Sequence, residues 1–220
     1  MRNIAIGIML LIILLALLGP DGAPRLISSL IPSFFEGVPC DRLRTASDRA
    51  NHQSLIGRGA PNPIAVNVQT SPIPATADGF LTIQIIVTNI SLGTVAFVYN
   101  PNQVIVGDNG SSGLGIIFSP PNSLSTGVTR QDNPNPPESD LRLLGPRQRC
   151  VHVLEFPAGN VLVEPQLAAG QTQVRAYYRN NNRGSITQPP NTFATPIFTD
   201  AGLWTGVVES PNITIPRAGG

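Results

Sequence analysis

The stretch FLTIQIIVTN, residues 80–89, decides the fold class because apolar and polar side chains alternate along it. One face carries the apolar positions Leu81, Ile83, Ile85 and Val87, and the other carries Thr82, Gln84 and Thr88. A period of two residues is typical of a half-buried strand in an antiparallel sheet. The stretch therefore predicts a strand with one face in a hydrophobic core.

The same alternation recurs from Ile64 onward. Seven further strands are predicted, in TVAFVYN (94–100), QVIVGD (103–108), LGIIF (114–118), RCVHVLEF (149–156), NVLVEP (160–165), TQVRAYYRN (172–180) and NITI (212–215). Clusters of Gly, Asn, Pro and Asp separate them, as expected for turns. The chain has 21 glycines and 22 prolines among 220 residues, which disfavours long helices. The predicted fold class is all-β, an antiparallel two-sheet sandwich.

Two segments carry a family resemblance: FLTIQIIVTNIS (80–91) and LAAGQTQVRAYYRN (167–180). They resemble bacterial extracellular immunoglobulin-like domains, which commonly combine a strand ending in VTN with a later turn and strand of the form GQT…V…Y. The resemblance covers residues 64–215 and implies an immunoglobulin-like sandwich. It implies no particular activity, because such domains mostly serve adhesion, assembly or spacing. Cys40 precedes the predicted strands, so a disulfide of the antibody type is not expected.

The N-terminal segment contains an unbroken apolar run of 15 residues, from Ile4 to Leu18, directly after Arg2. As a helix this run spans about 22 Å, less than the hydrocarbon core of about 30 Å, which favours a signal peptide. No register, however, places small residues at the positions that a signal peptidase needs. The following stretch PRLISSLIPSFF, residues 24–35, places its apolar side chains on one helical face and suits a membrane interface.

These features predict four parts of the chain. Residues 1–35 form a retained hydrophobic helix, a signal anchor, with an interfacial amphipathic segment; residues 36–62 are a linker with a short helix; residues 63–216 are the sandwich; and residues 217–220 are a tail. Cleavage of the apolar run, which would release a secreted domain, is the alternative. The positive start keeps the N-terminus inside, so the sandwich is expected to be extracytoplasmic.

The chain has two cysteines, Cys40 and Cys150. In an exported protein they predict one disulfide. Such a bond would tie the linker to the body of the domain. A reactive or metal-bound thiol is the alternative.

Charge composition excludes several function classes. All 14 positive charges are arginines, so the lysine required by a P-loop, a protein kinase or a Schiff base is missing. The net charge of +1, with no basic stripe, argues against nucleic acid as a partner, and no nucleotide is expected either. The preference for arginine also suggests a GC-rich bacterial genome, so we give little weight to the three glycosylation sequons at Asn89, Asn109 and Asn212.

No catalytic or metal constellation is recognisable. The two histidines, His52 and His152, accompany no GxSxG motif, and the glycines of GDNGSSGLG, residues 107–115, predict a tight hairpin turn rather than a nucleotide loop. The CVH motif at Cys150 could begin a copper site, but no second ligand set accompanies it. Glu155 and Glu164 do not stand out as a hydrolytic pair. We therefore expect no enzyme, no metal and no cofactor.

Candidate partner contacts come from two places. RLLGPRQRC, residues 142–150, carries Arg142, Arg147 and Arg149, which suit partner carboxylates or pair internally with Asp140 and Glu155. The exposed-aromatic candidates are Trp204, Tyr177 and Tyr178, although Tyr178 shares a face with apolar residues and is predicted to be in the core. The proline-rich residues 119–140 predict a mobile surface loop, or alternatively a partner-binding loop.

The sequence thus predicts a membrane-anchored extracytoplasmic β-sandwich. Its expected role is that of a structural or accessory interaction subunit, docked on other membrane or envelope proteins, for example in an electron-transport assembly. The alternative is a secreted or anchored module that binds glycan or envelope polymer.

Overall fold

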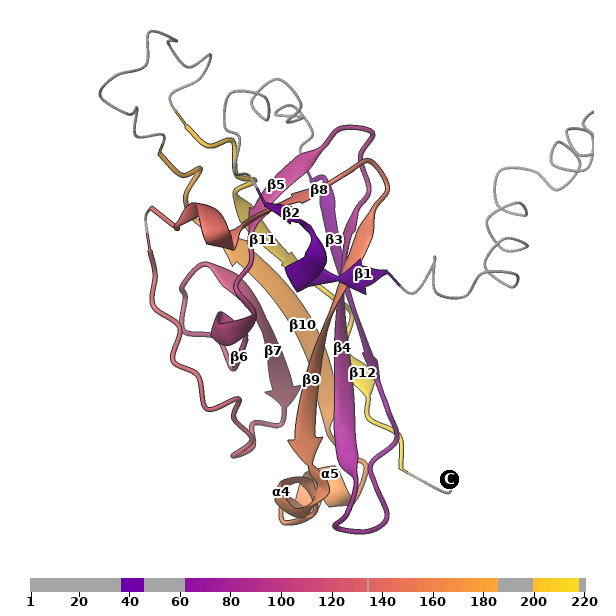
Figure 1. Cartoon of the computed structure of the whole chain (residues 1–220). Coiled ribbons are helices and arrows are strands. Elements are labelled where there is room, and N and C mark those ends of the chain that lie inside the picture. Colours follow the sequence, from indigo (N-terminus) through magenta and orange to yellow (C-terminus); the bar gives the residue numbers. More distant parts are fainter. Residues whose placement is uncertain (1–36, 46–61, 134, 186–199, 218–220) are drawn as a thin grey trace, which may run out of the picture. The chain divides into compact units, whose positions relative to one another are not determined.

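A computed structural model describes residues 37–45, 62–133, 135–185 and 200–217 (Figure 1). The predicted anchor and interfacial segment, residues 1–35, lie outside the described residues. The chain divides into two units, Met1–Gly37 and Val38–Gly220, and every element below belongs to the second unit. Among the described residues, no helix combines the length and apolar character that a membrane span requires.

The second unit is built mainly of strands, which confirms the predicted all-β class. The strands are β1 (Val38–Pro39), β2 (Arg44–Thr45), β3 (Ile64–Thr70), β4 (Phe80–Asn89), β5 (Val95–Val98), β6 (Ile105–Val106), β7 (Gly113–Ser119), β8 (Leu141–Leu144), β9 (Arg149–Pro157), β10 (Gln173–Asn180), β11 (Gly206–Glu209) and β12 (Ile213–Thr214). The short helices are η1 (Cys40–Arg42), η2 (Pro101–Gln103), η3 (Glu138–Asp140), α4 (Ala158–Leu162) and α5 (Pro165–Ala168).

These strands form several sheets, consistent with a sandwich. The first sheet has the order β1-β9-β4-β3, the second has β11-β10-β7-β6 with β12 also paired to β10, and a third has β2-β8-β5. Most pairs are antiparallel, as predicted, whereas β1 pairs with β9 and β6 with β7 in parallel. Because β6 and β7 run in the same direction, the hairpin predicted for residues 107–115 is wrong.

Two glycines of that stretch, Gly113 and Gly115, serve packing within β7. A Cβ added at Gly113 would lie 2.8 Å from Nη1 of Arg130, and one at Gly115 would lie 2.6 Å from the hydroxyl of Tyr177. Side chains at these two positions would therefore displace two buried groups. At Gly107 and Gly110 the reason differs, because their φ angles of 90° and 79° are backbone conformations that favour glycine.

The core follows the alternation in the sequence. Every apolar position on the predicted inner face of β4 is fully buried, namely Leu81, Ile83, Ile85 and Val87. Tyr178 is also fully buried, which confirms its predicted core position. Phe118 of β7 meets Phe156 of β9 with ring centroids 6.1 Å apart, so the first and second sheets share one core.

Strand assignment failed in two segments. NVLVEP was predicted as a strand, but α4 and α5 occupy this region. A short apolar run does not distinguish a strand from a helix, and Pro165 stands at the first turn of α5, where proline is favoured. Strand β8 was not predicted at all, because its four residues are all buried and therefore show no polar face.

In the two segments that resemble immunoglobulin-like domains, the strands β4 and β10 each end in a buried asparagine. Asn89, at the end of VTN, is buried, and its Nδ2 donates to the carbonyls of Gly93, Leu144 and Gly145 at 2.6, 3.1 and 2.8 Å. Asn180, at the end of YYRN, donates in the same way to the carbonyl of Trp204 at 2.7 Å. Each amide satisfies buried backbone carbonyls and joins a main strand to a neighbouring segment. Burial also leaves the Asn89 sequon inaccessible in the folded domain.

Candidate functional site: a groove along the edge of β9

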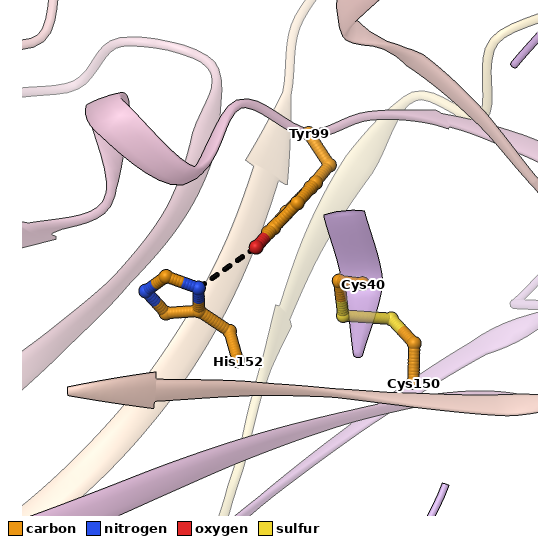
Figure 2. Close-up of a disulfide and its surroundings, with 4 residues drawn as sticks. All are labelled: Cys40, Tyr99, Cys150 and His152. Atoms are coloured by element: carbon orange, nitrogen blue, oxygen red, sulfur yellow. Dashed lines mark hydrogen bonds between the residues drawn. A yellow bond between two sulfur atoms is a disulfide. The ribbon is translucent and has the colours of Figure 1, made fainter. Parts of the chain in front are cut away.

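The disulfide predicted between Cys40 and Cys150 is present (Figure 2). It joins η1 to β9 beside the short parallel pairing of β1 with Cys150 and Val151. Residues 38–45, which the sequence assigned to a linker, therefore pair with the body of the domain through β1 and β2. Because the sulfur of Cys150 is bonded to Cys40, it is not available as the copper ligand considered for the CVH motif.

His152 lies two residues further along β9 and is paired with Tyr99. The Tyr99 hydroxyl lies 2.8 Å from Nδ1 of His152, and the second ring nitrogen points away from Tyr99 (Figure 2). Burial lowers the pKa of His152 to about 4, against a weaker opposing effect of Asp41. Burial also raises the pKa of Tyr99. Both side chains are therefore neutral at pH 7 and act as an uncharged hydrogen-bonded pair.

Acidification is expected to destabilise the protein through His152. The folded-state pKa lies below the unfolded value of 6.5, so between pH 6.5 and about 4 the unfolded chain binds more protons. The contribution of neutral His152 to the free energy of unfolding is fully present above pH 6.5. As the pH falls, on the order of 2–3 kcal/mol of it is lost. Urea unfolding at pH 7, 5.5 and 4 measures this loss.

The matched control for this prediction is His152→Gln, which keeps a polar side chain but does not titrate. Carboxylates titrate in both proteins and cancel in the comparison, whereas the imidazole titrates only in wild type. The difference in unfolding free energy between wild type and His152→Gln should therefore shrink as the pH falls. A difference that stays constant across this range would contradict the assignment of a buried neutral imidazole.

A groove of about 610 Å³ opens beside this pair. Six consecutive residues of β9, 152–157, line it, together with residues 123–126 of the long loop and with Asn160 and Val163 near α4. Its floor is apolar and buried, formed by Val104, Leu124, Leu154 and Phe156. An apolar floor with a polar rim is the arrangement expected of a binding site.

The groove follows the edge of a strand. Successive residues of β9 point to opposite faces of the first sheet, so one groove can touch all six only along the strand edge. β4 pairs with β9 along its other side, from Thr88 opposite Arg149 to Phe80 opposite Pro157. Among the described residues, β1 covers only Cys150 and Val151 on the groove side. The remaining edge therefore faces the groove without a strand partner in that part of the chain.

The loop that forms the opposite wall has defined contacts, in contrast to the predicted mobile loop. Arg130 is only 2% exposed and inserts into the second sheet. Its Nε donates to Ser111 Oγ at 2.9 Å, Nη1 to the Leu114 carbonyl at 2.7 Å and Nη2 to the Tyr177 hydroxyl at 2.8 Å. Leu124 adds a buried apolar contact. Sequence reasoning missed Arg130, because a single arginine in a proline-rich loop carries no local signal of burial.

The three predicted partner arginines do not form one patch. Arg142 lies on β8, is 8% exposed, and donates from Nη1 to the carbonyls of Ser139 and Leu141. Arg147 and Arg149 are exposed. The carboxylate of Asp140, the expected internal partner, accepts hydrogen bonds from Asn100 and Ser139 at 3.1 and 3.2 Å. Burial therefore removes Arg142 from the candidate contact surface and leaves Arg147 and Arg149 on it.

The predicted aromatic candidates lie largely inside the domain. Tyr177 and Tyr178 are buried, and Trp204 is half-buried with its ring 5.9 Å from that of Tyr178. Gly206 lies beneath the indole, because a Cβ there would come within 2.8 Å of the ring. These contacts give Trp204 a packing role at the margin of the core and leave only part of its ring to solvent.

A second hollow, of about 310 Å³, is lined mainly by amide and hydroxyl side chains, together with Val98, Pro136 and Pro137. Asn100, Gln103, Gln131 and Asn133 contribute amides, and Asp140 contributes a carboxylate. Across the described ranges, no group of three or more His, Cys, Asp or Glu side chains is arranged to hold a metal ion. Comparison with protein-family models, with curated proteins and with solved structures finds no match for this chain.

Proposed function

We propose that this protein is a membrane-anchored, extracytoplasmic interaction module that binds another membrane or envelope protein through the groove along β9. The observation that carries the proposal is the combination of a buried apolar floor with a strand edge that β1 covers at only two residues. Strand edges and apolar grooves are the surfaces by which β-sandwich modules engage extended partners.

The compartment and the architecture belong to the same proposal. A disulfide between buried cysteines supports an oxidising location, since such bonds are rare in the cytosol. The apolar run from Ile4 to Leu18 supports an N-terminal helical anchor. The immunoglobulin-like arrangement of the strands is proposed from the segments that resemble that family.

Site-specific photo-cross-linking in intact cells tests the proposed function. Val153 lines the groove and Val207 lies on β11 of the second sheet; the two valines are 47% and 51% exposed. A photoreactive amino acid at position 153 is expected to give one discrete protein adduct in the membrane fraction, with none from position 207. The absence of an adduct at 153, or the same adducts from both positions, would contradict the proposal. Mass spectrometry of the N-terminus tests retention of the anchor independently.

A glycan-binding module is the second candidate, and the 310 Å³ hollow favours it. Amide side chains such as Gln131 and Asn133 hydrogen-bond sugar hydroxyls, and both are exposed at this hollow. The burial of Tyr177 and Tyr178, by contrast, removes two aromatic rings that a sugar could stack on. Binding of envelope polysaccharide that is lost in Gln131→Ala would support this second function.

A further inference from the structure

The two sides of the first sheet, beside β3 and beside β9, differ in what lies next to them. On the β3 side, the amide of Ile73 donates to the Pro216 carbonyl at 2.8 Å, and Ile73 forms a parallel bridge with Arg217. This pairing connects the chain after β3 with the chain after β12. On the β9 side, the groove lies between residues 152–157 and the loop wall. The β9 edge is therefore one of the sheet edges without a strand partner among the described residues, and it is the one that lines the groove.

The groove has the length and the chemistry for an extended segment. Six residues at about 3.3 Å each give an edge of about 20 Å, enough for a six-residue strand. Backbone N–H and C=O groups along a free strand edge pair with an incoming strand whatever its sequence. The hydroxyl of Thr126, which lines the groove, is buried and has no hydrogen-bond partner among the described residues. A polar group of an occupant would satisfy it, since such a group is costly when left unpaired.

The side chains of β9 specify which segment would fit. Leu154 and Phe156 point into the buried floor, so an occupant needs apolar side chains at its inward positions. On the other face, Val153 is an exposed apolar side chain and Glu155 is exposed, with no ion pair among the described residues. Since His152 is neutral at pH 7, Glu155 is the charged side chain that lines the groove. A cation beside it would form a favourable cross-strand pair.

We propose that the groove binds an extended segment of a partner protein, which adds as a strand to the edge of β9 and places a basic side chain beside Glu155. This inference rests on the proposed function and names the form and charge of the partner. A second copy of this chain fits less well, because pairing of two β9 edges would bring two Glu155 carboxylates to one interface, where like charges repel.

Synthetic peptides test the inference on the full-length protein in detergent micelles. The probe is a blocked seven-residue peptide of alternating Val and Thr with Arg at the centre, compared with the same peptide carrying Glu at the centre. We expect the Arg peptide to bind about five- to ten-fold more tightly at low salt, because it exchanges a repulsive cross-strand pair for an attractive one. Bound peptide should slow hydrogen exchange of the amides in residues 152–157.

Charge reversal provides the matched controls. Glu155→Arg should invert the preference, so that the Glu peptide binds more tightly. Glu209→Arg makes the same charge change on β11, the edge strand of the second sheet, where it also removes the exposed Arg175–Glu209 ion pair of 3.7 Å. It should leave the preference unchanged. Thr126→Val should weaken both peptides several-fold without altering their ranking.

Three results would overturn the inference: equal binding of the two peptides, protection outside residues 152–157, or self-association of Glu155→Arg in place of altered peptide binding. The last would mean that Glu155 serves only to keep copies of this edge apart. If the cross-link from position 153 persists in any of these cases, groove binding stands and only the added-strand mode fails. Loss of the cross-link as well would remove the proposed function itself.

Discussion

Arg130→Met is expected to lower the free energy of unfolding by about 2–4 kcal/mol. The substitution removes a buried guanidinium and leaves the Ser111 hydroxyl, the Leu114 carbonyl and the Tyr177 hydroxyl without their shared donor. It also removes a cation–π contact, since the guanidinium carbon lies 5.5 Å from the centre of the Tyr177 ring. Relief from burying a charge opposes this loss. The Ser111 and Tyr177 hydroxyls keep their bonds to Asn109 and Gly107, so the cost comes from three lost hydrogen bonds to a charged donor and from the unpaired Leu114 carbonyl contact.

Two controls separate the network from a general effect of losing an arginine. Arg130→Lys keeps the charge but cannot reach three acceptors with one ammonium group, so it should fall between wild type and Arg130→Met. Arg179→Met removes a half-exposed arginine that pairs with Asp108 at 2.7 Å and should cost less than about 1 kcal/mol. Urea unfolding followed by tryptophan fluorescence gives the energies.

The same substitution should loosen the groove wall. Hydrogen exchange in residues 119–133 is expected to accelerate in Arg130→Met before global unfolding, because Arg130 holds this loop to β7 and β10. A variant as stable as wild type, with unchanged exchange in the loop, would show that the network contributes little.

Removal of the disulfide is the second large effect. Cys40→Ala combined with Cys150→Ala is expected to cost about 3–5 kcal/mol, because the bond closes a loop of 110 residues in the unfolded chain. Both sulfurs are buried, so loss of packing adds to the entropic effect. For a domain of this size the melting temperature should fall by about 10 °C.

Reduction provides a chemical control for the double variant. Wild type unfolded under a strong reductant should approach the stability of the variant, whereas the variant itself should not respond to reductant. The amides of residues 38–45 should lose protection first, because β1 pairs with β9 at only two positions beside the bond. Equal stability of the oxidised and disulfide-free proteins would contradict the prediction.

Much of the fold could be predicted from the chain because the information is local. Alternation in residues 80–89 identified the buried face of β4 without error, since each side chain's face depends only on its position along a strand. The buried position of Tyr178 followed from the same periodicity. The disulfide followed from counting, because two cysteines allow one pairing. By contrast, β8 was missed because a strand covered on both faces has no polar period.

The sequence by itself thus determined the strand class, the inward faces of the main strands and the cysteine pair. Only the tertiary structure decided that Arg130 is buried, that Arg142 leaves the surface while Arg147 and Arg149 stay on it, and that residues 152–157 form an edge beside a groove. The reason is physical: the exposure of an arginine and the pairing of a strand edge depend on which distant segments lie against them. That proximity is set by the folded chain as a whole and leaves no periodic pattern in the neighbouring residues.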